Sequence, residues 1–438
     1  MNKVMSYRIV KSTNIDWKML GNILKNLQKE TRLVKNKSIQ VYKEWQDYCE
    51  EFKKEHNKYP KIKDTYGVAN IDDVCYRKLK DLIVYMNIGN FISTITRATV
   101  KFKALYKDIL CGNVSIPSFR NNLPIDIKNQ NIKKLTCVDG QYNVILSLLS
   151  NKIKEKLDLS IGMINVILEA NDNTQKVILD KCISGEYKIC TSQIIYRKNK
   201  WILNLCYGFN VKQQETLDPN KIIGVDLGIA VPAYAAFNFD TSKRYHIKDD
   251  SVIRYKLRLS KDLSNAKAQK RYIGDGSTGH GLKCRMKLYK KYSNRAHNYQ
   301  KTKNHIWSKA IVEWAYKNGC GTIQMEDLSG FTNSHSQDKF LGQWTYYELQ
   351  QDIKYKAKEK GIRTIFIDPK YTSQRCSECG CIHKENRPQK PNQSKFKCIE
   401  CGFEANADFN AARNISTLNI DNIIKKYLKE HKTDANIA

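Results

Sequence analysis

The sequence predicts an α/β protein of several domains, and three observations support this fold class. Residues 222–229 read Ile-Ile-Gly-Val-Asp-Leu-Gly-Ile, in which β-branched residues predict a short buried strand that ends at Asp226. Residues 17–52 instead repeat apolar side chains every three or four positions, which is typical of an amphipathic helix. The chain has 438 residues, enough for two or three domains with cores of their own.

Acidic residues at the ends of predicted elements are the candidate catalytic groups. Asp226 ends its strand just before a glycine, a pattern that by itself is often only a turn. A second apolar strand, residues 322–328, contains Glu326 and Asp327 near its end, and Asp408 lies in the first turn of a predicted helix. Each acid also has a structural interpretation, as a solvated strand end or as a charge that stabilises a helix N-terminus.

These acids come from two strands and a helix, in the chain order that an RNase H-like site requires. Such a site holds two Mg²⁺ ions, which take carboxylate oxygens as ligands. A pair of metal ions about 3.5–4 Å apart can stabilise both the attacking and the leaving oxygen at a phosphodiester. We therefore expect Asp226, Glu326 and Asp408 to act together.

The charge balance predicts a polyanionic partner. There are 75 Lys and Arg residues against 44 Asp and Glu residues, a net charge of +31. Binding to nucleic-acid phosphates is the natural interpretation. A membrane surface is the competing one, but no stretch approaches the roughly 18 apolar residues of a spanning helix. The N-terminal residues lack the apolar core of a signal peptide, and the 14 cysteines favour reduced thiols and a metal site, so we expect a cytoplasmic protein.

The N-terminal half is predicted to be helical first and β-rich afterwards. Residues 3–10 alternate like a strand, a helix begins near Trp17, and more helix is expected over residues 71–110. The apolar stripe of the first helix, which Thr31 and Ser38 interrupt, suits a bundle core, although a dimer seam uses the same pattern.

After Pro117 and Pro124 the pattern changes. Residues 142–149 and 156–167 are predicted strands, and residues 187–209 are predicted to form a hairpin. Several short strands in about 100 residues indicate a small barrel or sandwich.

In the C-terminal half, the strand that ends at Asp226 is followed by another apolar strand at residues 230–239 and then by two basic helices. Residues 274–281 are rich in glycine but lack the ending of a phosphate-binding P-loop, so we expect a mobile connection or lid between the helices. Residues 280–304 contain no acid and carry tyrosines among their basic side chains. A solvated helix face is the ordinary explanation, yet the pattern also suits a nucleic-acid channel. The candidate contacts are Lys283, Arg285, Lys287, Lys290, Lys291, Arg295, Lys301 and Lys303.

Two C-x-x-C motifs are the strongest single signal. A helix over residues 343–361 and a strand over residues 363–368 precede them. The four cysteines have the spacing of a zinc ribbon, in which each motif presents two thiolates to one Zn²⁺ ion. A redox role fits poorly, and Cys381 is too close to its neighbour to replace a ligand easily. The predicted ligands are Cys376, Cys379, Cys398 and Cys401.

These motifs together resemble those of RNA-guided nucleases. Residues 223–228 (Ile-Gly-Val-Asp-Leu-Gly), 324–328 (Gln-Met-Glu-Asp-Leu), 371–380 (Tyr-Thr-Ser-Gln-Arg-Cys-Ser-Glu-Cys-Gly) and 406–415 (Asn-Ala-Asp-Phe-Asn-Ala-Ala-Arg-Asn-Ile) are similar to the RuvC and zinc-ribbon motifs of that group. The group includes the transposon-encoded TnpB proteins and the miniature type V-F CRISPR effectors. The resemblance to the type V-F effectors extends over essentially the whole chain.

The resemblance implies an α/β multidomain fold with an RNase H-like RuvC domain, an inserted zinc ribbon, a small β-barrel (wedge) domain and a helical recognition domain. The implied boundaries are 1–14 for the first wedge strand, 15–115 for the recognition domain, 116–217 for the wedge barrel, 218–370 for RuvC, 371–404 for the ribbon and 405–438 for the end of RuvC and the tail.

The resemblance also implies an activity. A guide RNA directs the protein to double-stranded DNA beside a short, T-rich adjacent motif, and one RuvC site cuts the DNA. Asp226 bridges both Mg²⁺ ions, while Glu326 and Asp408 complete one metal site each. Two copies of the protein share one guide.

Three other interpretations remain at this stage. A TnpB-like nuclease guided by transposon-end RNA would have the same chemistry and the same site residues. A zinc-ribbon nucleic-acid-binding protein would not cut, and its acids would be structural. An unguided resolvase-type nuclease would cut branched DNA without RNA.

Overall fold

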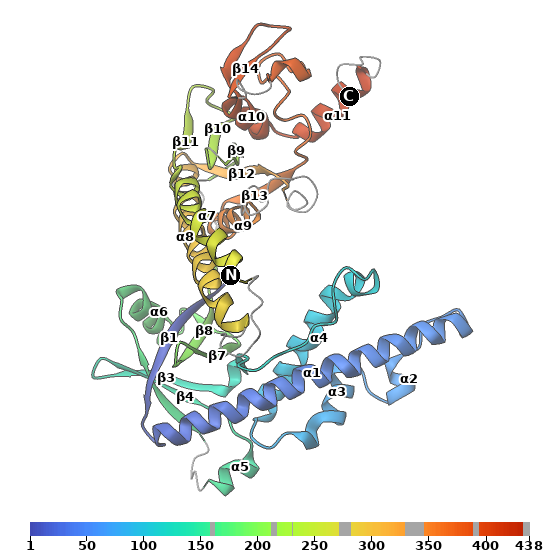
Figure 1. Ribbon diagram of the computed structural model, residues 1–438, viewed down its shortest axis with the longest axis vertical. Coiled ribbons are helices and arrows are strands. Elements are labelled where there is room, and N and C mark those ends of the chain that lie inside the picture. The colour runs from blue at the N-terminus through green and yellow to red at the C-terminus, as the bar shows by residue number, and fades with distance from the viewer. Residues whose placement is uncertain are drawn as a thin grey trace. The chain divides into compact units, whose positions relative to one another are not determined.

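The computed structural model describes residues 1–157, 163–211, 217–229, 231–270, 282–328, 346–388 and 394–431, apart from the side chains of residues 269–270 and 282–285. The chain divides into two compact units, Met1–Asn210 and Val211–Ala438 (Figure 1). Each unit has a sheet and a hydrophobic core of its own. The α/β multidomain class predicted from the sequence is confirmed.

The first unit is built on an eight-stranded sheet with β1 (Asn2–Ser12) at its centre. Strand β1 pairs antiparallel with β5 (Ile164–Glu169) on one side and with β8 (Lys200–Gly208) on the other. The strand order is β2-β7-β8-β1-β5-β4-β3, and β6 also pairs with β8. The remaining strands are β2 (Ile125–Ile127), β3 (Ile132–Val138), β4 (Gln141–Leu146), β6 (Lys188–Ile189) and β7 (Ser192–Arg197).

Helix α1 (Trp17–His56) contributes much of the first core. The Asp16 carboxylate caps its start by accepting hydrogen bonds from the backbone of Lys18 and Met19. Thr31 and Ser38, which interrupt the apolar stripe, are both buried, and the Thr31 hydroxyl donates to the Leu27 carbonyl at 2.8 Å. The helix contacts α3 (Ile71–Leu79) and α4 (Ile88–Leu110), so its apolar face is a bundle core (Figure 1). Shorter helices are α2 (Ile62–Tyr66), α5 (Asn151–Lys156) and α6 (Asn173–Ile183).

The helical sequence expected over residues 71–110 is confirmed as α3 and α4. Between these helices the Glu30 carboxylate accepts hydrogen bonds from three successive backbone N–H groups of residues 84–86. One expectation for this unit is wrong in detail. The predicted strand over residues 156–167 begins only at Ile164, because only residues 164–169 pair with β1 and β4. Residue 156 instead ends α5, and residues 158–162 lie outside the described part.

The second unit has a five-stranded mixed sheet in the order β11-β10-β9-β12-β13. Strand β9 (Asp218–Asp226) pairs parallel with β12 (Cys320–Glu326) and antiparallel with β10 (Ala233–Phe237). Strand β13 (Arg363–Ile367) extends the parallel part, and β11 (Arg244–Ile247) forms the antiparallel edge. This arrangement is the predicted RNase H-like sheet.

Helices cover the second sheet. The basic helices α7 (Ser251–Lys270) and α8 (Leu282–Lys317) run alongside each other, and α8 also contacts α9 (Tyr346–Glu359) (Figure 1). The buried side chains of Trp307 and Ile311 on α8 join the core beneath β9 and β12. The predicted glycine-rich connection, residues 274–281, lies outside the described residues, as do residues 343–345 before α9.

The chain ends in a small ribbon and two helices. Strands β14 (Lys395–Lys397) and β15 (Glu404–Asn406) pair antiparallel, and α10 (Ala407–Ser416) follows directly. Helix α10 contacts β9, β10 and β12, whereas α11 (Ile420–Glu430) closes a separate small core. The ribbon thus lies in sequence immediately before the helix that carries Asp408.

Candidate active site and cysteine cluster

The sheet brings two of the predicted acids to one edge. Asp226 is the last residue of β9, and Glu326 is the last residue of β12. These strands are parallel neighbours, with Met325 opposite Val225, so their acids meet at the carboxyl ends of adjacent strands. The neighbouring Asp327 is exposed, and its N–H donates to the Ile367 carbonyl at 2.8 Å.

Asp408 reaches the same edge because α10 lies very close to β9. The Asn406 side chain caps the helix by accepting hydrogen bonds from Asp408 N and Phe409 N. Gly224 on β9 allows the close approach: a Cβ there would lie 2.2 Å from Ser416 N and 2.3 Å from the Ala412 carbonyl oxygen. Only glycine fits this position without moving the helix.

The three acids influence one another electrostatically. Burial raises the pKa of Asp226 well above its usual range, and the negative charges of Glu326 and Asp408 raise it further. Burial also raises the pKa values of Glu326 and Asp408. A half-buried group of carboxylates whose pKa values stay raised has less positive charge around it than three ionised acids need. Hard divalent cations supply such charge and prefer carboxylate oxygens, so the donor set fits a cation of this kind.

Three further residues belong to this site, and the sequence motifs did not indicate their roles. The Arg387 guanidinium lies 4.0 Å from the Asp408 carboxylate, and its charge opposes the rise in pKa of all three acids. The Thr372 hydroxyl donates to Glu326 at 2.5 Å. Burial and the nearby Asp226 raise the pKa of Tyr346 to about 12.

Arg387 and Thr372 lie in the segment between β13 and α10, where no strand or helix period marks them. The sequence holds no signal for Arg387, whose place is fixed by its neighbour. Asn386 is a fully buried amide at the end of a short 3-10 helix, and it donates to the Gln374 carbonyl and accepts from Ile399 N, both at 3.0 Å. A buried asparagine of this kind fixes the backbone beside it.

The four cysteines of the C-x-x-C motifs form one compact group. Their Sγ atoms all lie within 4.8 Å of one another, close enough to hold one metal ion together. Each motif forms a turn of the same kind. Gly380 N donates to the Cys376 carbonyl at 3.0 Å, and Gly402 N donates to the Cys398 carbonyl at 3.1 Å. Both glycines have positive φ, +84° and +72°. The group has the composition of a site for one metal ion.

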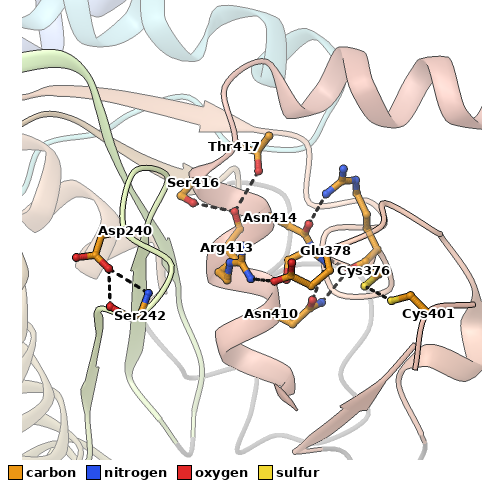
Figure 2. A network of polar contacts seen from close by, with 12 residues as sticks. Asp240, Ser242, Cys376, Glu378, Cys401, Asn410, Arg413, Asn414, Ser416 and Thr417 are labelled. Carbon is orange, nitrogen blue, oxygen red and sulfur yellow. Dashed lines mark hydrogen bonds and ion pairs between the residues drawn. The ribbon is translucent and has the colours of Figure 1, made fainter. Parts of the chain in front are cut away.

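The cysteine group is tied to α10 through polar contacts (Figure 2). The Arg413 guanidinium forms an ion pair with Glu378, which lies inside the first C-x-x-C motif. Asn410 Nδ2 donates to the Arg375 carbonyl at 2.8 Å, and the Arg375 guanidinium donates to Asn414 at 2.6 Å. The helix that positions Asp408 is therefore anchored directly to the first motif.

The predicted nucleic-acid contacts on α8 differ in their surroundings. Lys303 is half-buried, and its ammonium group donates to the Asp249 carboxylate at 2.9 Å, to which Trp307 also donates at 3.0 Å. The side chains of Lys283 and Arg285 lie outside the described part. The remaining candidates are exposed on α8: Lys287, Lys290, Lys291, Arg295 and Lys301.

Known proteins resemble this chain over most of its length. The family model "Cas12f1-like, TNB domain" matches residues 346–415. A protein named CRISPR-associated endodeoxyribonuclease Cas12f1 from Sulfoacidibacillus thermotolerans is 44% identical over 433 residues, which cover 98% of this chain and 100% of the relative. A protein of the same name from Syntrophomonas palmitatica is 33% identical over 75% of this chain and 72% of the relative.

The fold is also found in a solved structure. The protein chain in a cryo-EM structure of a Cas12f1–sgRNA–target DNA complex superimposes with a TM-score of 0.72, over 95% of this chain and 99% of that chain, at 18% identity. The likeness to that structure shows a shared fold. Because the sequence match to the Sulfoacidibacillus relative extends over the full length of both proteins, this chain belongs to the Cas12f1 family. Within the described residues, every helix is too short or too polar to cross a membrane.

Proposed function

We propose that this protein is an RNA-guided endonuclease that cuts double-stranded DNA beside a short adjacent motif. The observation that carries the proposal is the meeting of Asp226, Glu326 and Asp408, which come from three distant parts of the chain, in a member of the Cas12f1 family. The relatives are named endodeoxyribonucleases, and the solved relative is in complex with sgRNA and target DNA.

Asp226, Glu326 and Asp408 would together hold two Mg²⁺ ions, with Asp226 contributing to both sites. Bound metal would supply the positive charge that makes a water molecule a better nucleophile and eases departure of the 3′ oxygen of the phosphodiester. Thr372 holds one oxygen of Glu326 through its hydrogen bond and so fixes the orientation of that carboxylate. Arg387 brings a positive charge to the edge of the site, where it can attract the phosphate group of the DNA strand.

Sequence specificity comes from base pairing with the guide RNA, and the protein contacts the backbone and the adjacent motif. The net charge of +31 supports binding to nucleic-acid phosphates. The exposed basic side chains of α8 are the proposed backbone contacts: Lys287, Lys290, Lys291, Arg295 and Lys301.

The four-cysteine group is proposed to hold one structural Zn²⁺ ion, because four thiolates suit its tetrahedral coordination. We assign residues 15–115 to guide and adjacent-motif recognition, and residues 1–14 and 116–217 to the wedge domain. Residues 218–370 and 405–438 form the nuclease domain around the ribbon at residues 371–404. Two chains are proposed to act on one guide RNA.

The catalytic proposal is tested by alanine substitution in the reconstituted guide complex. Asp226→Ala, Glu326→Ala and Asp408→Ala should each abolish Mg²⁺-dependent cleavage while binding of guide and target DNA stays nearly unchanged. Asp327→Ala is the matched control, since this acid is adjacent to Glu326 but exposed, and it should keep cleavage. Appreciable cutting by Asp226→Ala at saturating Mg²⁺ would remove that residue from the site.

Cleavage assays and identification of the RNA that copurifies with the protein separate the other interpretations. A zinc-ribbon binding protein would show no Mg²⁺-dependent cutting at all, and a resolvase-type nuclease would cut branched DNA without RNA. A TnpB-like protein would copurify with transposon-end RNA, whereas a CRISPR effector copurifies with repeat-derived guide RNA. The full-length match to Cas12f1 from Sulfoacidibacillus thermotolerans favours the CRISPR effector.

A further inference from the structure

A cavity of about 300 Å³ lies between helices α7 and α8, and neither the acids nor the cysteines contribute to it. Side chains of α7 line it at spacings of seven and four residues, and those of α8 line it mostly at three- and four-residue spacing, so each helix contributes one face. The polar lining residues are Lys256, Lys267, Tyr289, Ser293, His297 and Gln300.

Gln300 is the least expected member of this lining. Its side chain is only 2% exposed, and within the described part of the chain its Nε2 atom has no hydrogen-bond partner. A buried amide that donates no hydrogen bond lowers the stability of the folded protein, so such groups are usually satisfied. An acceptor atom of a ligand in the cavity would satisfy it.

The charge of the lining selects the kind of ligand. Two lysines and a histidine line the cavity, and no carboxylate is among the lining residues. Burial lowers the pKa of Lys256 to about 8, which means that its ammonium form has been moved out of water. The positive charge of the lining therefore suits an anionic ligand.

We propose that this cavity binds a single nucleotide, with its phosphate held by Lys256 and Lys267 and its base against Tyr289. Phosphate is the anion that lysines commonly bind as point charges. Aromatic side chains bind bases by stacking, and the Gln300 amide can donate to an acceptor on the base or sugar. The volume is at the lower end for small-molecule sites, and a phosphate ion alone would fill little of it.

The nucleotide has two sources that share this chemistry: a free mononucleotide or one nucleotide of a bound strand. The proposal does not depend on the cleavage mechanism, because its readout is binding and it holds equally for an Asp226→Ala protein. Failure of the catalytic proposal and failure of this one are therefore distinguishable.

The first arm titrates AMP, adenosine and inorganic phosphate into the guide-free full-length protein by calorimetry. The second arm maps ultraviolet cross-links from a short 4-thiouridine-labelled RNA to tryptic peptides of the protein. Both arms use Gln300→Leu, Lys267→Ala and Lys267→Arg. Lys261→Ala is the matched control, because Lys261 is an exposed lysine of α7 outside the cavity lining.

If the ligand is a free mononucleotide, AMP should bind more tightly than adenosine or phosphate. Gln300→Leu and Lys267→Ala should each weaken AMP binding at least tenfold. If the source is a strand, the label cross-links to the peptide containing Tyr289, and the same variants remove that cross-link. In either case Lys267→Arg and Lys261→Ala should retain the signal. Gln300→Leu should unfold at the same or a higher temperature than the parent protein, since it removes an unpaired donor.

No AMP binding together with no cross-link at Tyr289 would overturn the proposal. It would also be overturned if Gln300→Leu and Lys267→Ala left both signals unchanged. Should Gln300→Leu fail to fold, the exposed Lys267 still provides the deciding comparison with Lys261.

Discussion

Replacement of Gly224 by alanine should nearly abolish cleavage without touching a catalytic side chain. The new Cβ would lie 2.2 Å from Ser416 N and 2.3 Å from the Ala412 carbonyl oxygen. Ordinary contacts require about 3.5 Å or more, so α10 must move by roughly 1 Å or more. Asp408 moves with this helix, and a shift of about 1 Å at a reacting group can cost about 100-fold in rate. Overpacking should also cost about 1–3 kcal/mol of stability.

The assay compares single-turnover cleavage rates of the guide complex at saturating Mg²⁺, alongside target binding and thermal unfolding. Gly21→Ala is the matched control: it is the same substitution in α1, and no atom lies within 4 Å of its Cβ. That variant should keep full activity and equal or greater stability, because alanine favours the helix. A Gly224→Ala complex that cuts within threefold of the parent rate would refute the reasoning about α10.

Three other predictions concern the metal, the assembly and acid stability. Elemental analysis should find one zinc per chain, lost on substitution of any one of the four ligand cysteines by serine, whereas Cys381→Ser should keep the metal. Mass measurement of the active guide complex should give two protein chains. A globule of this length has a radius of gyration of about 22 Å and covers a guide duplex of about 20 base pairs poorly. An active particle with one chain would contradict this prediction. Burial tends to raise the pKa of Asp249, but hydrogen bonds from Ser251, Lys303 and Trp307 lower it to about 2. Since that is below its unfolded value of about 4, Asp249 should stabilise the folded protein above pH 4, and this stabilisation should be lost as the pH falls from 4 to 2. Asp249→Asn should therefore flatten the pH dependence of unfolding in that window.

Most of the fold could be predicted from hydrophobic periodicity. The strand at β1, the long helix α1 and the hairpin of β7 and β8 all follow from local patterns, because each buries one regular face. The predicted strand over residues 156–167 was wrong at its start, because only residues 164–169 pair with β1 and β4, and partners far along the chain are not visible in a local pattern. The hydrogen bonds of Glu30 with residues 84–86 could not be predicted for the same reason, since the acid lies some fifty residues away.

The candidate site was predictable only where its residues lie in regular elements. Asp226, Glu326 and Asp408 end strands or begin a helix, so the rules for strand ends and helix starts identify them. Arg387 and Thr372 come from irregular backbone, where position depends on tertiary contacts alone. The same applies to Lys303: its charge predicted a nucleic-acid contact, but only the fold brings Asp249 within 2.9 Å of it.

The cysteine cluster and the three acids are structurally coupled, because both are in contact with α10. Helix α10 is held from one side by its close contact with Gly224 and from the other by Glu378 and Arg375 of the first C-x-x-C segment. Arg387 lies between the two cysteine motifs, so it depends on the same support. Metal binding by the cysteines would therefore fix both Asp408 and the positive charge beside it. This coupling gives a physical reason for a ribbon directly before α10: the contacts of Glu378 and Arg375 add to the Asn406 cap in fixing the helix that carries Asp408 beside two other acids.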